Sequence, residues 1–368
     1  MVNSIFDSHN WLAVSHHFWS SVFFVLGCIV GSFLNVCIHR LPLGQSIISP
    51  PSHCPHSKYS IPWYLNIPLV TWLSLRGRCR NCGAPIAVRY FLVELLTGLM
   101  FLACWLAFGR QSVALTLVYC LLLSGLMAAS FIDFEHFIIP DEITIGGMVA
   151  GFLCSLALPG LQGQETRIAG AGQSLLGLAA GSGLVYAILR AGKFLFGRQR
   201  IPLTANSKII FTETTLCLPD REIPYEELFY RRSDVIALHA ETVELADRCY
   251  RDVLIRLAPE RLRIGDEEFD PESIPHMEAV STEIVLPREA MGLGDVKFMA
   301  AIGAFLGWQA VLFSLTVSSI IGSIVGITLI CFHRREWSSR LPYGPYIALA
   351  VTLWIFWGPR LMALLFPR

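Results

Sequence analysis

Long apolar stretches constrain the fold of this chain more than any other feature of its sequence. A helix needs about 20 apolar residues to cross roughly 30 Å of hydrocarbon at about 1.5 Å per residue. With 54% hydrophobic residues, 15% charged residues and a mean hydropathy of +0.55, the chain is too apolar for a water-soluble globule. The sequence therefore predicts an all-α polytopic membrane protein with about eight transmembrane helices. The apolar stretches lie near residues 18–38, 90–109, 112–132, 143–160, 168–190, 296–310, 311–332 and 343–366.

Basic residues indicate which ends of these helices face the cytoplasm. They gather after the first, fifth and seventh predicted helices, and these loops lie on one side of the membrane if the helix count is right. By the positive-inside rule that side is cytoplasmic, which leaves both termini outside. The formal net charge is +0, so the overall charge balance gives no support for a nucleic-acid partner. The basic residues are Arg40, Lys58, Arg76, Arg78, Arg80, Arg89, Arg190, Lys193, Arg198, Arg200, His333, Arg334 and Arg335.

Two polar segments interrupt the helices, both on the predicted cytoplasmic side. Residues 39–89 are rich in proline, cysteine and arginine and show no regular period. Residues 199–288 are rich in charge, and their alternating apolar residues favour short strands, so a small β-rich or α+β insert is predicted. Its acidic stretch near Asp266 is interpreted as a solvated face, with a partner surface as the alternative. The predicted domains are the first helix at 1–38, the cysteine-containing loop at 39–89, helices two to five at 90–198, the insert at 199–288 and helices six to eight at 289–368.

Two carboxylates lie at the ends of predicted membrane helices. Asp133 follows the third helix and Asp295 begins the sixth, so both are expected at the cytoplasmic face. A carboxylate at membrane depth is costly unless it faces a wet cavity or a partner, which makes each one a functional candidate. A helix cap is the alternative for Asp295, and plain solvent exposure is the alternative for Asp133.

A pair of aspartates brought close together can act as general acid and general base. Both cannot ionise comfortably, so one keeps a proton while the other accepts one from water. A water held between them could then attack a peptide carbonyl, and the pair would titrate as a unit. Gly292 and Gly294 would let backbone approach an extended substrate closely near Asp295.

Six short stretches of sequence connect these carboxylates to a known family. They are Gly31–Val36 with His39–Pro42, Asn66–Cys82, Arg89–Gly98, Ile132–Asp141, Gly292–Lys297 and Leu341–Ala350. In this order they resemble the type IV prepilin peptidase family, membrane aspartic peptidases with a GxGD motif. The stretches span the chain except for the insert, and an ordered set is far more specific than a lone GxGD.

The resemblance implies an enzyme of the bacterial inner membrane that removes the short basic leader from prepilins or pseudopilins on the cytoplasmic side. Asp133 and Asp295 match the two catalytic aspartates of the family. Many members also methylate the new N-terminal residue with S-adenosylmethionine, and Gly77 and Glu94 match residues tied to that activity. The implied partners are the prepilin or pseudopilin substrate and membrane lipid, with no nucleic acid.

Three further residues are expected to support the aspartates. Lys297 is expected to bind substrate or to stabilise the charged form of Asp295, with a snorkelling interfacial lysine as the alternative. Gly344 and Pro345 break the last helix near the cytoplasmic face. The resemblance favours a wall of the active cavity there over a local bend.

The loop at 39–89 departs from the family in its cysteines. Typical members carry two CxxC pairs that can hold zinc through four thiolates. Here Cys79 and Cys82 form one pair, but Ser57 stands where the partner of Cys54 is expected. A mixed structural site of Cys54, Cys79 and Cys82 with His56, or alternatively His53, is predicted, since imidazole binds zinc well. Free thiols in a reducing cytoplasm are the alternative.

Other readings of the sequence remain open. The presenilin type of GxGD protease has a tyrosine before its aspartate, whereas Ile132 precedes Asp133 here. A transporter or assembly scaffold would use the two acids for proton coupling instead of hydrolysis. A peptidase without methyltransferase activity is a third alternative, because one cysteine pair is incomplete and Phe91 replaces the usual proline of the family. For Asn35 and Glu94, an interhelical hydrogen bond is the alternative to a catalytic contact.

Overall fold

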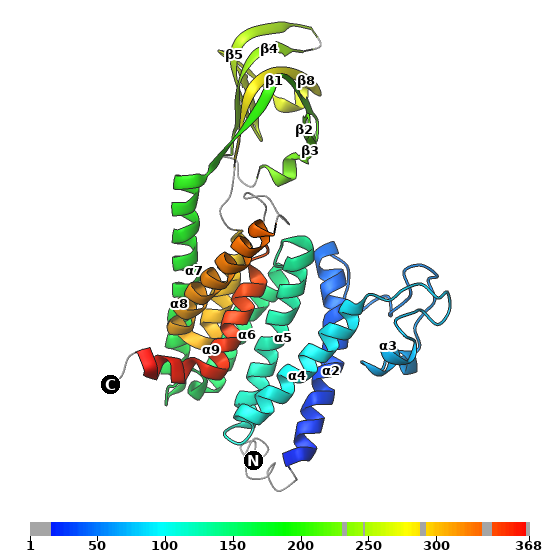
Figure 1. The fold of residues 1–368 in the computed structure, drawn as a ribbon. Helices are drawn as coiled ribbons and strands as arrows, with labels where there is room; N and C mark the ends of the chain where they lie inside the picture. The colour runs from blue at the N-terminus through cyan, green and yellow to red at the C-terminus, as the bar shows by residue number, and fades with distance from the viewer. Residues whose placement is uncertain (1–15, 230–233, 246, 288–291, 333–340, 366–368) are drawn as a thin grey trace. The chain divides into compact units, whose positions relative to one another are not determined.

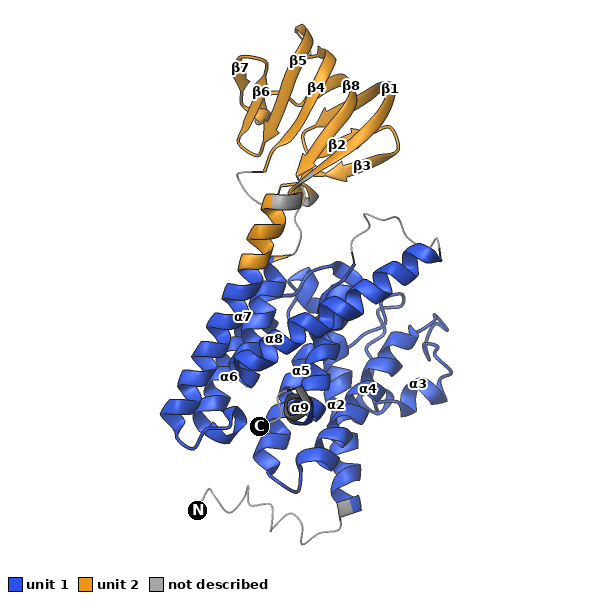
Figure 2. Ribbon diagram, turned by 60° about the vertical axis from the view of Figure 1, so that its left-hand side comes forward, with its two compact units in different colours: residues 1–186, 293–368 blue, residues 187–292 orange. Residues whose placement is uncertain are grey.

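The computed structural model describes residues 16–229, 234–245, 247–287, 292–332 and 341–365. The chain divides into two compact units (Figure 2), a helical unit of residues 1–186 and 293–368 and a second unit of residues 187–292 that holds a β-sheet. Three residues of the predicted basic loops, His333, Arg334 and Arg335, lie outside the described residues.

Helices occupy every stretch that the apolar pattern predicts (Figure 1). They are α2 (His16–Arg40), α4 (Val88–Phe108), α5 (Val113–His136), α6 (Asp141–Ala157), α7 (Arg167–Phe196), α8 (Leu293–Cys331) and α9 (Gly344–Leu365). Among the described residues, five helices are long and apolar enough to cross a membrane, namely His17–Leu43, Val88–Phe108, Val113–His136, Arg167–Phe194 and Leu293–Cys331. The helices fit the predicted polytopic membrane protein, and the count of eight crossings stays a prediction.

The long helix α8 is broken at Gly307, whose backbone angles are φ 82° and ψ 175°. A break of this kind frees carbonyl groups that must find other donors inside an apolar environment. Gln162 Nε2 donates to the carbonyl oxygens of Ala304 and Phe305, each at 3.0 Å. Ser174 Oγ also donates to Ala304 O at 2.7 Å. The break therefore lies close to the predicted boundary between the sixth and seventh helices. Side chains from the neighbouring segments stabilise it by donating to its carbonyl groups.

Contacts on either side of the break show that the two halves of α8 run in opposite directions. The start of the first half lies near the end of α5, because a Cβ added at Gly294 would lie 3.4 Å from Ile139 Cβ. The second half begins beside the far part of α9, where the rings of Phe313 and Trp354 lie 5.2 Å apart. It then returns toward the start of α9, where Ser318 Oγ and Tyr343 Oη lie 2.9 Å apart.

Glycines hold α2 against α4 and so position the loop between them. A Cβ added at Gly31 would lie 2.7 Å from the Cα of Glu94, and one added at Gly27 would lie 2.7 Å from the carbonyl of Thr97. Such small residues let helix backbones approach closely in membranes. The intervening loop holds the short helices η2 (Leu41–Leu43), η3 (Trp63–Leu65) and α3 (Val70–Ser74).

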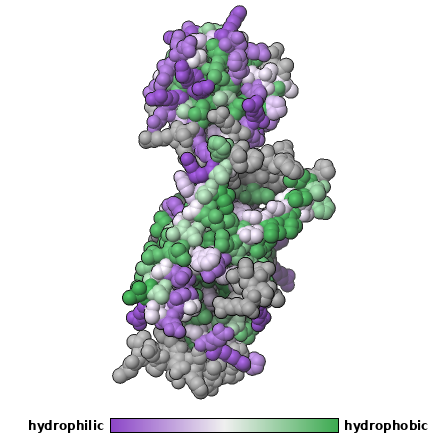
Figure 3. Space-filling view, turned by 90° about the vertical axis from the view of Figure 1, so that its left-hand side faces the viewer, coloured by the Kyte–Doolittle hydropathy of each residue, from purple (hydrophilic) through white to green (hydrophobic). Residues whose placement is uncertain are grey.

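The second unit contains one antiparallel eight-stranded sheet in the order β3-β2-β1-β8-β4-β5-β6-β7. Its alternating pattern is clear in β4, where Ile236, Leu238 and Ala240 are buried and the residues between them are not. Hydrophilic residues dominate the visible surface of the sheet, whereas hydrophobic ones dominate the helices (Figure 3). The predicted β-rich insert is therefore present. The strands are β1 (Arg198–Thr212), β2 (Thr215–Leu218), β3 (Arg221–Pro224), β4 (Ile236–Glu244), β5 (Cys249–Ala258), β6 (Arg261–Ile264), β7 (Glu267–Phe269) and β8 (His276–Pro287).

Candidate active site

Asp133 lies buried in the last turn of α5, with 6% of its surface exposed. The helix ends just after it, because Phe137 adopts a left-handed conformation and donates its amide to the carbonyl of Asp133 at 2.9 Å. The side-chain Oδ2 of Asp133 accepts the amide of Gly344 at 2.7 Å. A Cβ added at Gly344 would lie 2.9 Å from the same Oδ2, so the close approach of α9 requires glycine there.

Asp295 lies in the first turn of α8 and is partly exposed. A negative charge in that position is favoured by the helix dipole. The preceding residue, Gly294, packs against Ile139, which lies six residues after Asp133 along the chain. The structure thus places both predicted catalytic aspartates next to the connection between α5 and α6, one before it and one beside it.

Two ion pairs fix the same connection. Lys297 Nζ donates to both carboxylate oxygens of Asp141 at 2.6 and 2.9 Å and so ties α8 to the first residue of α6. Arg89 at the start of α4 pairs with Glu135, two residues after Asp133. Neither Arg89 nor Glu135 was singled out from the sequence as a site residue, because the pair joins positions 46 residues apart.

The remaining predicted supporting residues lie at helix starts. Pro345 follows Gly344 in the first turn of α9, where a missing backbone amide costs no helical hydrogen bond. Gly292 is exposed just before α8, and Met291 before it lies outside the described residues.

Glu94 is buried in α4, and its Oε2 accepts the amide of Leu69 at 2.8 Å. Leu69 has a φ of 61°, and the amide of the next residue, Val70, donates to the carbonyl of Pro68 at 2.6 Å, which defines a tight γ-turn. This is a strained backbone held by a buried carboxylate, and such strain is concentrated at functional sites. No local sequence pattern indicated this turn.

Gly77 packs against Trp72 of α3, the short helix that follows the Leu69 turn. It has a φ of 66°, and a Cβ added to it would lie 3.0 Å from the Trp72 ring. That ring in turn lies 5.2 Å from the ring of Phe91 on α4, one turn before Glu94. The structure therefore connects the two predicted methyltransferase residues, Gly77 and Glu94, through α3.

Asn35 makes an interhelical hydrogen bond, the alternative to a catalytic contact, from its Nδ2 to the carbonyl of Tyr90 at 3.0 Å. Its Oδ1 is buried and has no hydrogen-bond partner among the described residues. A buried acceptor without a donor is costly in a folded protein. Together with the Glu94 carboxylate it provides acceptor atoms that fit a cationic group, such as the sulfonium of S-adenosylmethionine.

Three cysteines gather in the loop between α2 and α4. The sulfur atoms of Cys54, Cys79 and Cys82 all lie within 4.8 Å of one another. Two thiolates on a tetrahedral zinc, each about 2.3 Å from the metal, lie about 3.8 Å apart. The observed distance between Cys54 Sγ and Cys82 Sγ is 3.7 Å, so these residues fit three corners of such a site.

The fourth corner is where the structure departs from the prediction. His56 is exposed and does not belong to the group of three sulfur atoms. The Ser57 hydroxyl is buried and faces the Cys54 sulfur. Hydrogen bonding from the Ser57 side chain, together with smaller contributions from the backbone amides of Ser57 and His56, lowers the pKa of Cys54 to about 6, which favours the thiolate that a metal requires.

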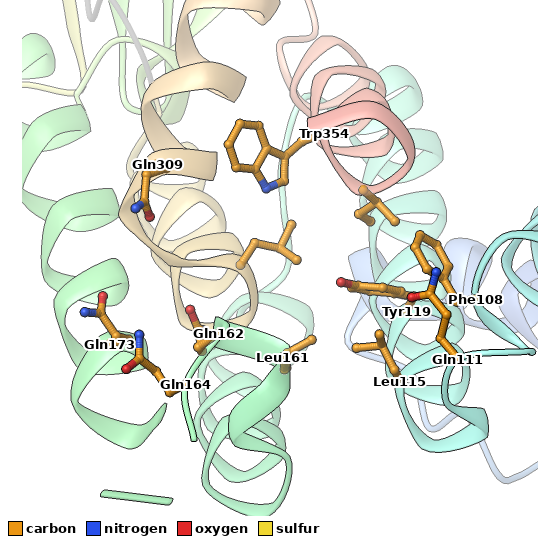
Figure 4. Close-up of a pocket in the computed structure, with 12 residues that line it drawn as sticks. Phe108, Gln111, Leu115, Tyr119, Leu161, Gln162, Gln164, Gln173, Gln309 and Trp354 are labelled. Atoms are coloured by element: carbon orange, nitrogen blue, oxygen red, sulfur yellow. The ribbon is translucent and has the colours of Figure 1, made fainter. Parts of the chain in front are cut away.

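A cavity of about 370 Å³ lies at the opposite end of α5 (Figure 4). Its wall includes Tyr119, Trp354 and several glutamines. Tyr119 is the α5 residue of this wall nearest to Asp133, and it precedes Asp133 by 14 residues, which is about 21 Å along the helix. The cavity is therefore separate from the aspartates.

Comparison with known proteins assigns this arrangement to a family. The Bacterial Peptidase A24 N-terminal domain matches residues 25–108, and the Type IV leader peptidase family matches residues 120–200 and 277–327. The prepilin leader peptidase/N-methyltransferase of Myxococcus xanthus (strain DK1622) is 44% identical over 344 residues, which cover 92% of this chain and 72% of that protein. The chain belongs to the type IV leader peptidase family. The resemblance drawn from the sequence is thereby confirmed.

More distant relatives cover the same length. Proteins with the same name from Aeromonas hydrophila and Pseudomonas aeruginosa are 29% and 26% identical over 362 residues, each covering 92% of this chain and 90% of the relative. The leader-peptidase match leaves out residues 201–276, which hold most of the sheet. No solved structure matches the chain.

Proposed function

We infer that this protein is a membrane aspartic endopeptidase that removes the leader of type IV prepilins or pseudopilins and then methylates the new N-terminal residue. The observation that carries the inference is the position of two carboxylates, one buried at the end of α5 and one at the start of α8, around the connection at residues 137–140. Membership of the leader peptidase family supports the same reaction.

In the proposed hydrolysis, Asp133 and Asp295 share one proton and one water. The ionised carboxylate takes a proton from the water as it attacks the scissile carbonyl, and the protonated carboxyl donates to the carbonyl oxygen. The Gly344 amide holds Asp133 in place through its hydrogen bond to Oδ2. The pairs Lys297–Asp141 and Arg89–Glu135 hold the neighbouring helix ends, and they position the aspartates without touching the reacting atoms.

We place this chemistry at the cytoplasmic face of the bacterial inner membrane. The two opposed halves of α8, together with the other six apolar helices, support eight crossings. Both aspartates then lie on the side of the basic loops, which the positive-inside rule assigns to the cytoplasm. The substrate would present its cleavage site there, where a basic leader meets an apolar helix. The five sequence domains proposed above, with boundaries at 38, 89, 198 and 288, follow this arrangement.

The methyltransferase activity is proposed for the region between α2, α3 and α4. When bound, S-adenosylmethionine supplies the methyl group. Glu94 and the Asn35 carbonyl oxygen would stabilise positive charge, either on the donor or on the substrate amine. Gly77 would keep Trp72 and the Leu69 turn in place beside them. The names of the relatives support this second activity.

A structural zinc ion is proposed at Cys54, Cys79 and Cys82. It would tie the two halves of the loop together, since 28 residues separate Cys54 from Cys82. The buried Ser57 hydroxyl is a better candidate for the fourth position than the exposed His56 side chain. A closed site of this kind provides no open position for a substrate water.

Substitution of the aspartates tests the proposal. We expect Asp133→Asn and Asp295→Asn each to abolish leader removal from a co-expressed prepilin, seen as loss of the gel shift, with normal membrane expression. Asp266→Asn is the matched control, because Asp266 is an exposed carboxylate in the hairpin between β6 and β7. Leader removal that survives both substitutions would exclude an aspartic mechanism and leave a scaffold or carrier.

A further inference from the structure

The loop segment at residues 63–74 exposes apolar side chains to an unusual degree. Trp63 is 82% exposed, Val70 is 59% exposed and Leu73 is 57% exposed, and Ile67 is exposed as well. Val70 and Leu73 lie three residues apart in the short helix α3 and so share one of its sides, and Ile67 lies just before the turn that leads into this helix. An exposed apolar patch of this kind marks a surface that meets another apolar phase or partner.

The opposite side of the same segment is fastened to α4. The Leu69 amide donates to Glu94, and the Trp72 ring packs against the ring of Phe91. Glu94 lies six residues beyond Val88, where the membrane-crossing helix begins, which is about 9 Å along the axis. The segment therefore lies alongside the membrane-crossing part of α4 instead of capping its end, as both ribbon views show (Figures 1 and 2).

The surroundings indicate what covers the apolar side. The helix α4, to which the segment is fastened, also exposes apolar side chains, among them Leu92 and Leu99. The loop that carries it has basic but no acidic residues, since no aspartate or glutamate occurs from residue 41 to residue 93. Arg76, Arg78 and Arg80 follow α3 directly and are exposed. An apolar surface bordered by arginines and aromatic rings is complementary to a bilayer interface with anionic lipid.

We propose that residues 63–74 form a re-entrant element that inserts Ile67, Val70 and Leu73 into the bilayer beside α4, while Arg76, Arg78 and Arg80 bind anionic phospholipid head groups. Trp63 lies at the interface, where its ring meets both phases. The lipid contact depends only on the membrane position of α4. Its consequence, that Glu94 is held at the lipid boundary close to the apolar start of a pilin, rests on the proposed function.

Photocrosslinking in the full chain tests this contact. p-Benzoylphenylalanine is placed at position 70 or 73, the protein is reconstituted in vesicles of phosphatidylethanolamine and phosphatidylglycerol, and adducts are identified by mass spectrometry after illumination. Position 99, exposed on α4, is the positive control, and position 241, exposed on β4, is the negative control. We expect lipid adducts at 70 and 73 within about threefold of position 99 and at least tenfold above position 241. Leader removal by each variant establishes that it is folded.

Two results would overturn the proposal. One is absence of lipid adducts at 70 and 73 while position 99 reacts. The other is replacement of lipid adducts by prepilin adducts when substrate is added, which would make the patch a substrate-docking surface.

The head-group contact is tested with the triple variant Arg76→Gln, Arg78→Gln, Arg80→Gln. In equimolar vesicles we expect several-fold more phosphatidylglycerol than phosphatidylethanolamine adducts at position 73, and a ratio near one in the triple variant; an unchanged ratio would refute that contact.

Discussion

The contact between Gly344 and Asp133 allows the proposed active site to be tested without removing a carboxylate. In Gly344→Ala, the new Cβ would lie 2.9 Å from Asp133 Oδ2 and 3.2 Å from its Cβ. Real Cβ atoms do not approach so closely, so either the Asp133 side chain or the start of α9 must move. In both cases the 2.7 Å hydrogen bond from the Gly344 amide to Asp133 is lost or distorted.

The size of the effect follows from that hydrogen bond. A hydrogen bond to a charged group contributes about 1.5–3 kcal/mol. Because about 1.36 kcal/mol corresponds to a tenfold change in rate, loss of the bond should reduce kcat for leader removal by about 10- to 150-fold. Gly344 positions Asp133 and is not placed against the substrate, so KM should change little.

The assay is steady-state leader cleavage of a purified prepilin by the reconstituted enzyme. Gly125→Ala is the matched control, because Gly125 lies in the same helix as Asp133 and a Cβ added there meets nothing within 4 Å. This control should retain full activity and equal or greater stability. A Gly344→Ala enzyme with the kcat of the wild type would show that Asp133 does not need this bond, and the proposed geometry would be wrong.

Three further substitutions test other parts of the structure. Ser57→Cys should raise zinc affinity at least tenfold by completing a four-thiolate site, measured as bound zinc per chain after dialysis against a weak chelator. Gly77→Ala should reduce N-methylation of the mature pilin by tenfold or more without slowing leader removal, because the added Cβ meets the Trp72 ring at 3.0 Å, and mass spectrometry of the pilin N-terminus measures it. Gln162→Leu should lower the free energy of unfolding by about 1–3 kcal/mol, seen in thermal unfolding, because it leaves the carbonyl of Phe305 without its donor.

Each of these has a control on the same chain. Ser60→Cys adds a thiol to the same loop outside the three-sulfur group and should not raise zinc affinity. Gly83→Ala shares the positive φ of Gly77, at 71°, but its Cβ meets nothing within 4 Å, so equal loss of methylation would assign the effect to backbone strain instead of Trp72. Gln164→Leu changes another glutamine of the same cavity, and an equal loss of stability would remove Gln162 from its role at the break.

The helices and the aspartates could be predicted because their signals are local. Apolar length predicts each membrane helix directly, and a carboxylate at the end of such a stretch is visible in the sequence. Alternation in the insert likewise predicted strands, and the turn at Gly265 and Asp266 joins β6 to β7. The break at Gly307 was found only as an approximate boundary, since its stability depends on donors from Gln162 and Ser174.

Features that depend on distant contacts could not be predicted. The γ-turn at Leu69 is held by Glu94, 25 residues later, and a sequence pattern does not record such a bond. The affinity of imidazole for zinc made His56, or alternatively His53, the expected fourth metal ligand, but the structure buries the Ser57 hydroxyl and leaves His56 exposed. The identity of a buried neighbour is set by the path of the backbone, which short-range spacing does not determine.

The helix α4 contributes residues to both proposed centres, the peptidase centre at the aspartates and the methyltransferase centre at Glu94. Its first turn carries Arg89, which pairs with Glu135 beside the aspartate of α5, and its second turn carries Glu94. The segment that α4 holds through Glu94 is the one with the exposed apolar side. A pilin whose leader has just been removed has an apolar N-terminus that is costly to expose to water. Because both proposed centres adjoin one helix at the same end of the helical unit, the new N-terminus would have only a short distance to move between hydrolysis and methylation.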